Sequence, residues 1–305
     1  MKLKLALFTC ATLVLAAIPI AALSQEDVRG AFLVSRQKDK PATNTNTAPR
    51  TSRRRPKQNP STAKDPKNPS GSTSSTGTVT KTPPPSGSTA KNPTAVNKQR
   101  MGLGLTLFRR DSNGNAVRTD PTTVFQKGDS VRVLLETNTD GYIYIFNTTN
   151  NGAPVMIYPN AELDEAGNYL QAHVPFEVPS SVGVDERLRW LVFDENAGDE
   201  RLIFVFTREP LAGVPIEDDL ISYCAGNKGC SWKPTDAVWT LVQSQASQPL
   251  QSDKEKQYGA TQTQQEQQAS TRGLGLAKDD PPPSLIMMAS SDTSTLVTTL
   301  DLIHK

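Results

Sequence analysis

One stretch of the sequence, residues 141–147, reads GYIYIFN. Successive side chains of an extended chain point to opposite faces. The aromatic residues of this stretch therefore share one face, and its two isoleucines share the other. A short run that is apolar on both faces and rich in aromatic and β-branched residues is typical of a buried strand in the core of a sheet. The stretch predicts a central strand of a β domain.

Further short segments with strand character flank this stretch and are separated by turn residues. Asn138-Thr139-Asp140-Gly141 precedes it, and Asn151-Gly152 follows it as a two-residue hairpin signal. The other strand candidates are 103–107, 131–135, 155–158, 174–178, 188–193 and 202–207. This pattern predicts an all-β fold, a single antiparallel β-sandwich or open barrel of about 7–9 short strands.

The C-terminal third is less regular in pattern. Residues 234–242 are expected to form a short helix, and residues 243–280 are rich in Gln, Ser, Thr and Lys and predict a polar insertion or linker. Residues 295–303 alternate again, so we expect this last strand to return and complete the sheet. The predicted domain spans 101–305, with its core in 101–212 plus 295–303.

Several of these segments together resemble the domain of unknown function 4384 family. They are Phe125-Gln-Lys-Gly-Asp129, Asn138 to Phe146, Ile157-Tyr-Pro-Asn160, and Glu200-Arg-Leu202 leading to Thr207-Arg-Glu-Pro210, with Leu300 to Lys305 similar to the last strand of that family. The resemblance implies a bacterial, exported or envelope-associated β domain. It supplies no catalytic residues.

The N-terminus has the three parts of a secretory signal. Residues 1–24 contain a basic start with Lys2 and Lys4, an apolar run, and small residues at Ala22 and Ser24. We expect cleavage before Gln25 and an exported, periplasmic or extracellular protein. A transmembrane anchor is the alternative, but the apolar run is short for about 20 spanning residues.

Residues 25–100 are expected to form a disordered, basic, Pro/Ser/Thr-rich tether. Residues 36–100 hold 14 Lys or Arg against two Asp, whereas 101–305 hold 16 basic and 27 acidic residues. The tether is therefore expected either to attract an anionic envelope polymer or lipid surface, or to serve only as a solvated spacer. Nucleic acid is not favoured. A short apolar piece from Val28 to Val34 is a docking peptide, a short strand or a disordered start.

Two cysteines remain once the signal is removed. Cys224 and Cys230 bracket the loop-like sequence Ala-Gly-Asn-Lys-Gly. In an oxidising compartment such a pair predicts a disulfide. A metal site lacks partners, because the two histidines, His173 and His304, are remote from the cysteines in sequence.

Catalytic motifs are sparse. A Ser-His-Asp arrangement would need His173 or His304, and an ordinary surface or edge histidine is the favoured interpretation of each. We expect no enzyme, no cofactor and no metal. Acidic clusters at 194–200 and 217–219 leave a calcium loop open, and a charged hairpin tip is the plainer explanation.

Four aromatic residues give the candidate binding face: Tyr142, Tyr144, Phe146 and Tyr158. They form a stacking platform if one face is exposed, and they are core residues if it is covered. The favoured function is a non-catalytic exported cell-envelope interaction module that binds a protein or peptide partner through the β domain. A carbohydrate or small-ligand binding domain is the alternative, and an enzyme is third.

Overall fold

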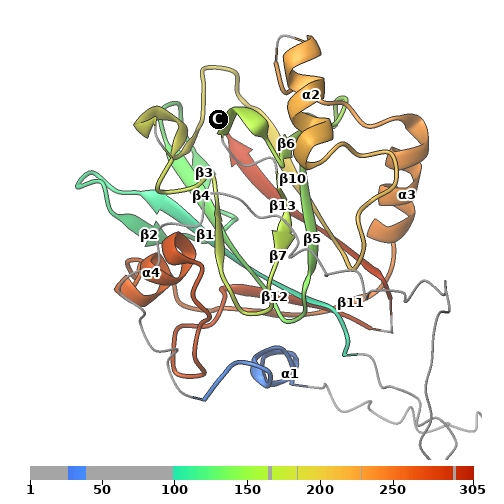
Figure 1. Ribbon diagram of the computed structural model, residues 1–305. Coiled ribbons are helices and arrows are strands. Elements are labelled where there is room, and N and C mark those ends of the chain that lie inside the picture. The colour runs from blue at the N-terminus through green and yellow to red at the C-terminus, as the bar shows by residue number, and fades with distance from the viewer. Residues whose placement is uncertain (1–26, 39–98, 164–166, 184, 228, 291–292) are drawn as a thin grey trace, which may run out of the picture.

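The computed structural model describes residues 27–38, 99–163, 167–183, 185–227, 229–290 and 293–305. In these ranges the chain forms two β-sheets with helices beside them (Figure 1). The sheets form a sandwich and do not close into a barrel, which confirms the predicted all-β class. Residues 1–24 and most of the tether lie outside the described residues, so the signal peptide and the tether stay predictions.

The first sheet has the strand order β11-β12-β1-β4-β8, with β2 paired to β1 and β9 paired to β4. All of its pairs are antiparallel. Its strands are β1 (Gly102–Arg110), β2 (Ala116–Arg118), β4 (Ser130–Thr137), β8 (Phe176–Val178), β9 (Leu191–Val192), β11 (Leu250–Lys254) and β12 (Leu285–Ala289).

The second sheet has the order β3-β13-β10-β5-β6, with β7 paired to β5. Its strands are β3 (Val124–Phe125), β5 (Gly141–Thr149), β6 (Val155–Tyr158), β7 (Tyr169–Leu170), β10 (Gly198–Thr207) and β13 (Thr295–His304). The C-terminal strand β13 pairs with β10 along its whole length, from His304 opposite Gly198 to Thr295 opposite Thr207. It therefore lies inside the sheet, between β10 and β3.

The core lies between the sheets and follows from the alternation along each strand. In β1 the leucines at 103, 105 and 107 point inward, while Gly102, Gly104 and Thr106 alternate with them. The same interior contains Ile143 and Ile145 of β5 and a run of buried residues from β10, β12 and β13. Fully burying an aliphatic or aromatic side chain of this size stabilises a fold by about 1.5–3 kcal/mol.

Two helices cover the outer face of the second sheet. They are α2 (Glu217–Asn227) and α3 (Asp236–Ala246), and they join a second apolar cluster with the aromatic face of β5. The helix predicted at 234–242 is α3, whose N-terminus is capped by Thr235 Oγ1, which accepts from Val238 N. Single 3₁₀ turns are η1 (Ala161–Leu163) and η2 (Glu186–Leu188).

The region 243–280 is not a simple polar insertion. It contains the end of α3, strand β11 and helix α4 (Gln264–Arg272). Strand β11 pairs with β12 through its backbone, and Leu250 is its one apolar residue, which packs against the core. Helix α4 begins with a capping box in which Thr263 and Glu266 satisfy each other's backbone N–H groups. Polar residues thus form ordered structure here through hydrogen bonds, which hydrophobic periodicity does not detect.

The start of the predicted tether is folded as well. Residues 27–38, which we call the N-terminal segment, form helix α1 (Val28–Leu33) and a following turn beside the first sheet (Figure 1). Val28 and Phe32 are buried against Ile286 and Met288 of β12. The expectation of disorder fails for these residues because the outer face of β12 and β1 offers them an apolar surface.

Across the described ranges, the helices are all too short or too polar to span a bilayer.

Candidate functional site

The N-terminal segment lies in a groove on the outer face of the first sheet, and two glycines make room for it. A Cβ atom at Gly102 would lie 2.7 Å from Phe32 Cδ2, and one at Gly104 would lie 3.2 Å from Phe32 Cζ. The same Cβ atoms would come still closer to Met288 Sδ, at 2.4 Å from Gly102, and to Pro283 Cγ, at 2.3 Å from Gly104, so a larger residue at either position would displace the Phe32 ring or these neighbours. Phe32 is fully buried, and its ring stands edge-on to the His173 ring at a centroid distance of 5.7 Å.

Arg36 anchors the other end of the segment. Its Nε donates to Glu136 Oε1 at 2.8 Å and its Nη2 to Glu136 Oε2 at 2.5 Å. Its remaining N–H groups donate to the carbonyl oxygens of Ala277, Asp280 and Pro281 at 3.2, 2.9 and 3.2 Å. All five N–H groups of the guanidinium therefore have an acceptor, and its side chain is completely inaccessible to solvent.

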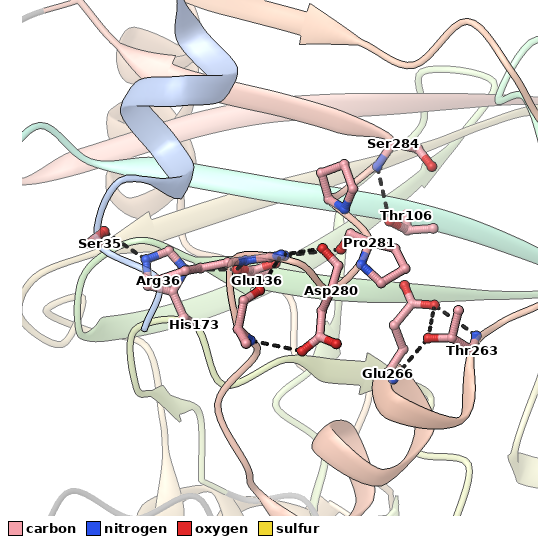
Figure 2. A network of polar contacts seen from close by, with 12 residues as sticks. Ser35, Arg36, Thr106, Glu136, His173, Thr263, Glu266, Asp280, Pro281 and Ser284 are labelled. Atoms are coloured by element: carbon pink, nitrogen blue, oxygen red, sulfur yellow. Dashed lines mark hydrogen bonds and ion pairs between the residues drawn. The ribbon is translucent and has the colours of Figure 1, made fainter. Parts of the chain in front are cut away.

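A third anchor runs through His173 (Figure 2). His173 Nδ1 lies 2.7 Å from Glu136 Oε1, and its Nε2 lies 2.7 Å from Ser35 Oγ. A carboxylate only accepts, so Nδ1 donates to Glu136, and Nε2 forms the second hydrogen bond, with Ser35 Oγ. His173 itself is positioned by its own backbone: its N–H donates to Thr137 O, and its carbonyl accepts from Leu276 N.

The segment also adds backbone pairing and further charge pairs. Gln37 forms a parallel bridge with Ala277, and Lys278 N donates to Gln37 O at 3.0 Å. Near the other end, Arg29 forms an ion pair with Asp253 and lies 3.5 Å from Glu255. The docking groove is thus built from β1, β4, β12 and the loops after β7 and α4. Its residues are Gly102, Gly104, Glu136, His173, Ala277, Asp280, Ile286 and Met288.

Glu136 is the negative charge at the bottom of this groove. Burial alone would raise the pKa of its carboxyl group, but the hydrogen bonds from His173 and Arg36 and the charges of both partners lower that pKa on balance. The carboxylate therefore stays ionised, and it needs a positive partner, since an unpaired buried charge is costly.

A cavity of about 630 Å³ adjoins the Ser35 end of the segment. It is lined by Ser35, Gln99, Asn138, Asp140, His173 and residues 273–276, among others. The Ser35–His173–Glu136 chain has the geometry of a hydroxyl nucleophile with its base. Hydrolysis would also need donors for an oxyanion, and the side-chain amide of Gln99 instead donates to Ser35 Oγ at 3.0 Å. What these contacts demonstrably do is hold the segment.

The predicted aromatic binding face is not exposed. Tyr142, Tyr144 and Phe146 are buried in the cluster beneath α2 and α3. Tyr158 is buried on the opposite side, between the sheets, because it pairs with the inward-facing Ile145. The hydroxyl of Tyr144 accepts from Leu211 N at 2.9 Å. The platform interpretation is wrong for these residues, since β5 is covered on both faces, and the core interpretation holds.

The remaining predicted residues are placed as follows. Cys224 and Cys230 form a disulfide, which confirms that pair, although α2 extends through Cys224 to Asn227 rather than leaving a loop. His304 is buried beside Phe193, at a ring distance of 5.0 Å. No group of three or more possible metal ligands occurs among the described residues.

The fold and the groove allow a comparison with known families. Residues 124–210 match the family model of DUF4384. DUF4384 is a domain of unknown function, and the match confirms the resemblance expected from the sequence. Neither the curated proteins nor the solved structures contain a match to the chain.

The DUF4384 segment supplies only part of the sandwich and part of the groove. It covers β3 to β10, and it contributes Glu136 and His173. Strands β1, β12 and β13, and the segment with Phe32 and Arg36, lie outside it.

Sequence reasoning missed the groove. The available signals were the Gly-Leu-Gly-Leu run at 102–105, whose glycines share one face, and Glu136, which shares the outer face of β4 with Arg132. An acidic residue within an apolar strand predicts a buried partner. Nothing in the spacing identifies that partner as Arg36, which precedes Glu136 by 100 residues.

Proposed function

We propose that this protein is a non-catalytic exported cell-envelope interaction module that binds a peptide segment of a protein partner in the docking groove. The observation that carries this proposal is the manner in which residues 27–38 fill the groove. An aromatic side chain enters a space left by two glycines, and four residues later an arginine meets a buried carboxylate with every N–H group satisfied.

These contacts follow the usual logic of peptide recognition. A few anchor side chains enter pockets, and backbone pairing fixes the register. Here Phe32 and Arg36 are the anchors, and the Gln37–Ala277 bridge supplies the backbone pairing. The partner segment expected from this chemistry has an aromatic residue followed four positions later by an arginine.

The chain's own segment would act as a tethered ligand. Residues 39–98, 60 in number, separate it from the next described residue. Joining a ligand to its site through a chain of suitable length raises its effective concentration to the millimolar range for short flexible linkers and lower for longer ones. A partner peptide must therefore displace residues 27–38 before it can bind.

Export and envelope association belong to this proposal as well. They are supported by the signal-like residues 1–24 and by the Cys224–Cys230 disulfide, since disulfides persist in oxidising compartments. The basic charge of residues 39–98 would attract an anionic envelope polymer or lipid surface. Such attraction would weaken with salt, because the Debye length falls from about 30 Å to about 8 Å between 0.01 M and physiological ionic strength.

A titration with a fluorescent peptide tests the peptide proposal. The mature chain carrying Phe32→Ala and Arg36→Ala keeps its groove residues but loses both anchors, so its own segment should leave. A labelled peptide of residues 27–38 should then bind this emptied variant saturably. The matched control is the same peptide with Arg36→Glu, which places a second negative charge beside Glu136 and should not bind.

If both peptides bind equally, or neither binds a variant whose circular dichroism matches the wild type, the groove is not a peptide site. In that case residues 27–38 are only a structural part of the domain.

A further inference from the structure

Three arginines line a second cavity, which shares no lining residue with the docking groove. It measures about 520 Å³. It lies between the C-terminal end of β1, the N-terminal end of β4, the loop before β9 and the start of α4. Its charged lining residues are Arg110, Arg132, Arg189 and Glu186. This volume is within the ordinary range for small-ligand pockets, about 300–1,000 Å³.

This cavity is positively charged, although the part of the chain that forms it is acidic overall. Residues 101–305 carry 16 basic and 27 acidic residues, yet three arginines and one glutamate meet here. Burial lowers the pKa of Arg132 most, the charge of Glu177 raises it in part, and the charges of Arg189 and Arg110 lower it further. An anion in the cavity would relieve this repulsion.

The arginines differ in how much of their hydrogen-bonding capacity is already used. Arg132 is buried, packs on the Trp190 ring at 4.0 Å and donates twice to Arg189 O, which fixes its position. Its Nη1 is 3.8 Å from Glu177 Oε2, too long for a hydrogen bond. Arg110 pairs with Ala116 through its backbone, but its exposed side chain has no ion-pair or hydrogen-bond partner among the described residues.

Neutral polar groups line the rest of the cavity. They include the side chains of Asn115, Thr261, Gln262 and Gln267, which suit the hydroxyl groups of a sugar. Ser181 adds a buried hydroxyl that has no hydrogen-bond partner among the described residues. A buried, unpaired hydroxyl beside a cavity is a ready partner for a ligand.

We infer that this cavity is a binding site for a sugar that carries a carboxylate or a phosphate group. Arg110, Arg132 and Arg189 hold the anionic group, and the amide and hydroxyl side chains contact the ring hydroxyls. This site is independent of the docking groove and of the proposed peptide partner.

The test uses the full mature chain and three sugars: glucuronate, glucose 6-phosphate and uncharged glucose. Trp190 lies at the cavity, so its fluorescence can report binding alongside calorimetry. Glucuronate, glucose 6-phosphate or both should bind saturably, and glucose should bind at least about tenfold more weakly. The comparison of the two anionic sugars shows whether carboxylate or phosphate is the preferred group.

Two arginine variants decide whether the site is this cavity. Arg110→Gln should weaken binding about tenfold with no change in thermal stability, because Arg110 is exposed. Arg187→Gln is the matched control: it removes the same charge from the neighbouring loop, but Arg187 points to Asp185 and does not line the cavity. The inference is overturned if glucose binds as well as the anionic sugars, if none of the three binds, or if both variants weaken binding equally.

Discussion

Arg36 and Glu136, 100 residues apart, form a two-pronged ion pair that is closed off from solvent. A buried ion pair of this kind adds little net stability compared with an apolar pair, but removing one partner is costly. The pair therefore specifies which segment occupies the groove more than it stabilises the sandwich. Substitutions of either residue can therefore be tested for their effect on the segment while the strands stay folded.

Replacing Glu136 should release the N-terminal segment. In Glu136→Gln the Arg36 guanidinium would be buried without a counter-charge, a loss of about 3–5 kcal/mol if the segment stayed in place. Because the segment can leave, we expect rapid amide hydrogen exchange at residues 28–37 while the strands remain protected. Glu195→Gln is the control, since Glu195 is exposed and its pair with Lys127 lies on the surface. Retained protection of the segment in Glu136→Gln would show that the ion pair is dispensable.

The glycine at 102 should be coupled energetically to Phe32. Gly102→Ala alone brings a methyl group within 2.7 Å of the Phe32 ring, whereas the same change in a Phe32→Ala background does not meet that ring. A double-mutant cycle followed by urea unfolding should give a coupling free energy in the range of about 0.5–3 kcal/mol. Additive effects would mean that the cost of Gly102→Ala comes from its other close neighbours, Met288 and Asn138, and not from Phe32.

Docking should weaken in acid. The pKa of Glu136 in the folded protein is below its ordinary value of 4.5. The stabilisation from its ionised form is therefore fully present above about pH 4.5 and is lost as the pH falls through the lower, folded-state pKa. Exchange protection of residues 28–37 should follow this dependence in the wild type and lose it in Glu136→Gln. Protection that increases on acidification would contradict the sign of the shift.

Truncation after residue 283 should unfold the whole sandwich. It removes β12 and β13, which lie between other strands in the two sheets. The buried hydrophobic residues larger than alanine that would be lost number seven: Ile286, Met287, Met288, Leu296, Val297, Leu300 and Leu302. At about 1.5–3 kcal/mol each, their loss is comparable to or larger than the roughly 5–15 kcal/mol stability of a typical protein. An unchanged melting temperature by circular dichroism would instead restrict the domain to about 101–212.

The strands were predictable because their signal is local. Alternation at 103–107, 141–147 and 295–303 predicts β1, β5 and β13. The long polar region before β13 does not prevent it from pairing with β10. The helices were harder to predict from the sequence. Helix α2 buries a single described side chain, Leu220, and so has almost no apolar periodicity.

The groove was not predictable for a related reason. The apolar piece from Val28 to Val34 leaves a docking peptide open, but it does not say where Phe32 docks, and Arg36 has no local pattern that indicates burial. The partners of both residues lie more than 60 residues away along the chain. The burial of the four predicted aromatic residues shows the converse limit. Alternation says which side chains share a face, but whether α2 and α3 cover that face depends on tertiary packing.

The affinity of one peptide for two forms of the chain decides whether residues 27–38 occupy the docking groove as a displaceable ligand. The labelled peptide of residues 27–38 is titrated into the wild-type mature chain and into the Phe32→Ala, Arg36→Ala variant under the same conditions. Binding to the wild type should be at least about tenfold weaker, because its own segment competes for the docking groove. Equal affinity for the two forms would place the peptide elsewhere on the molecule and would contradict the account.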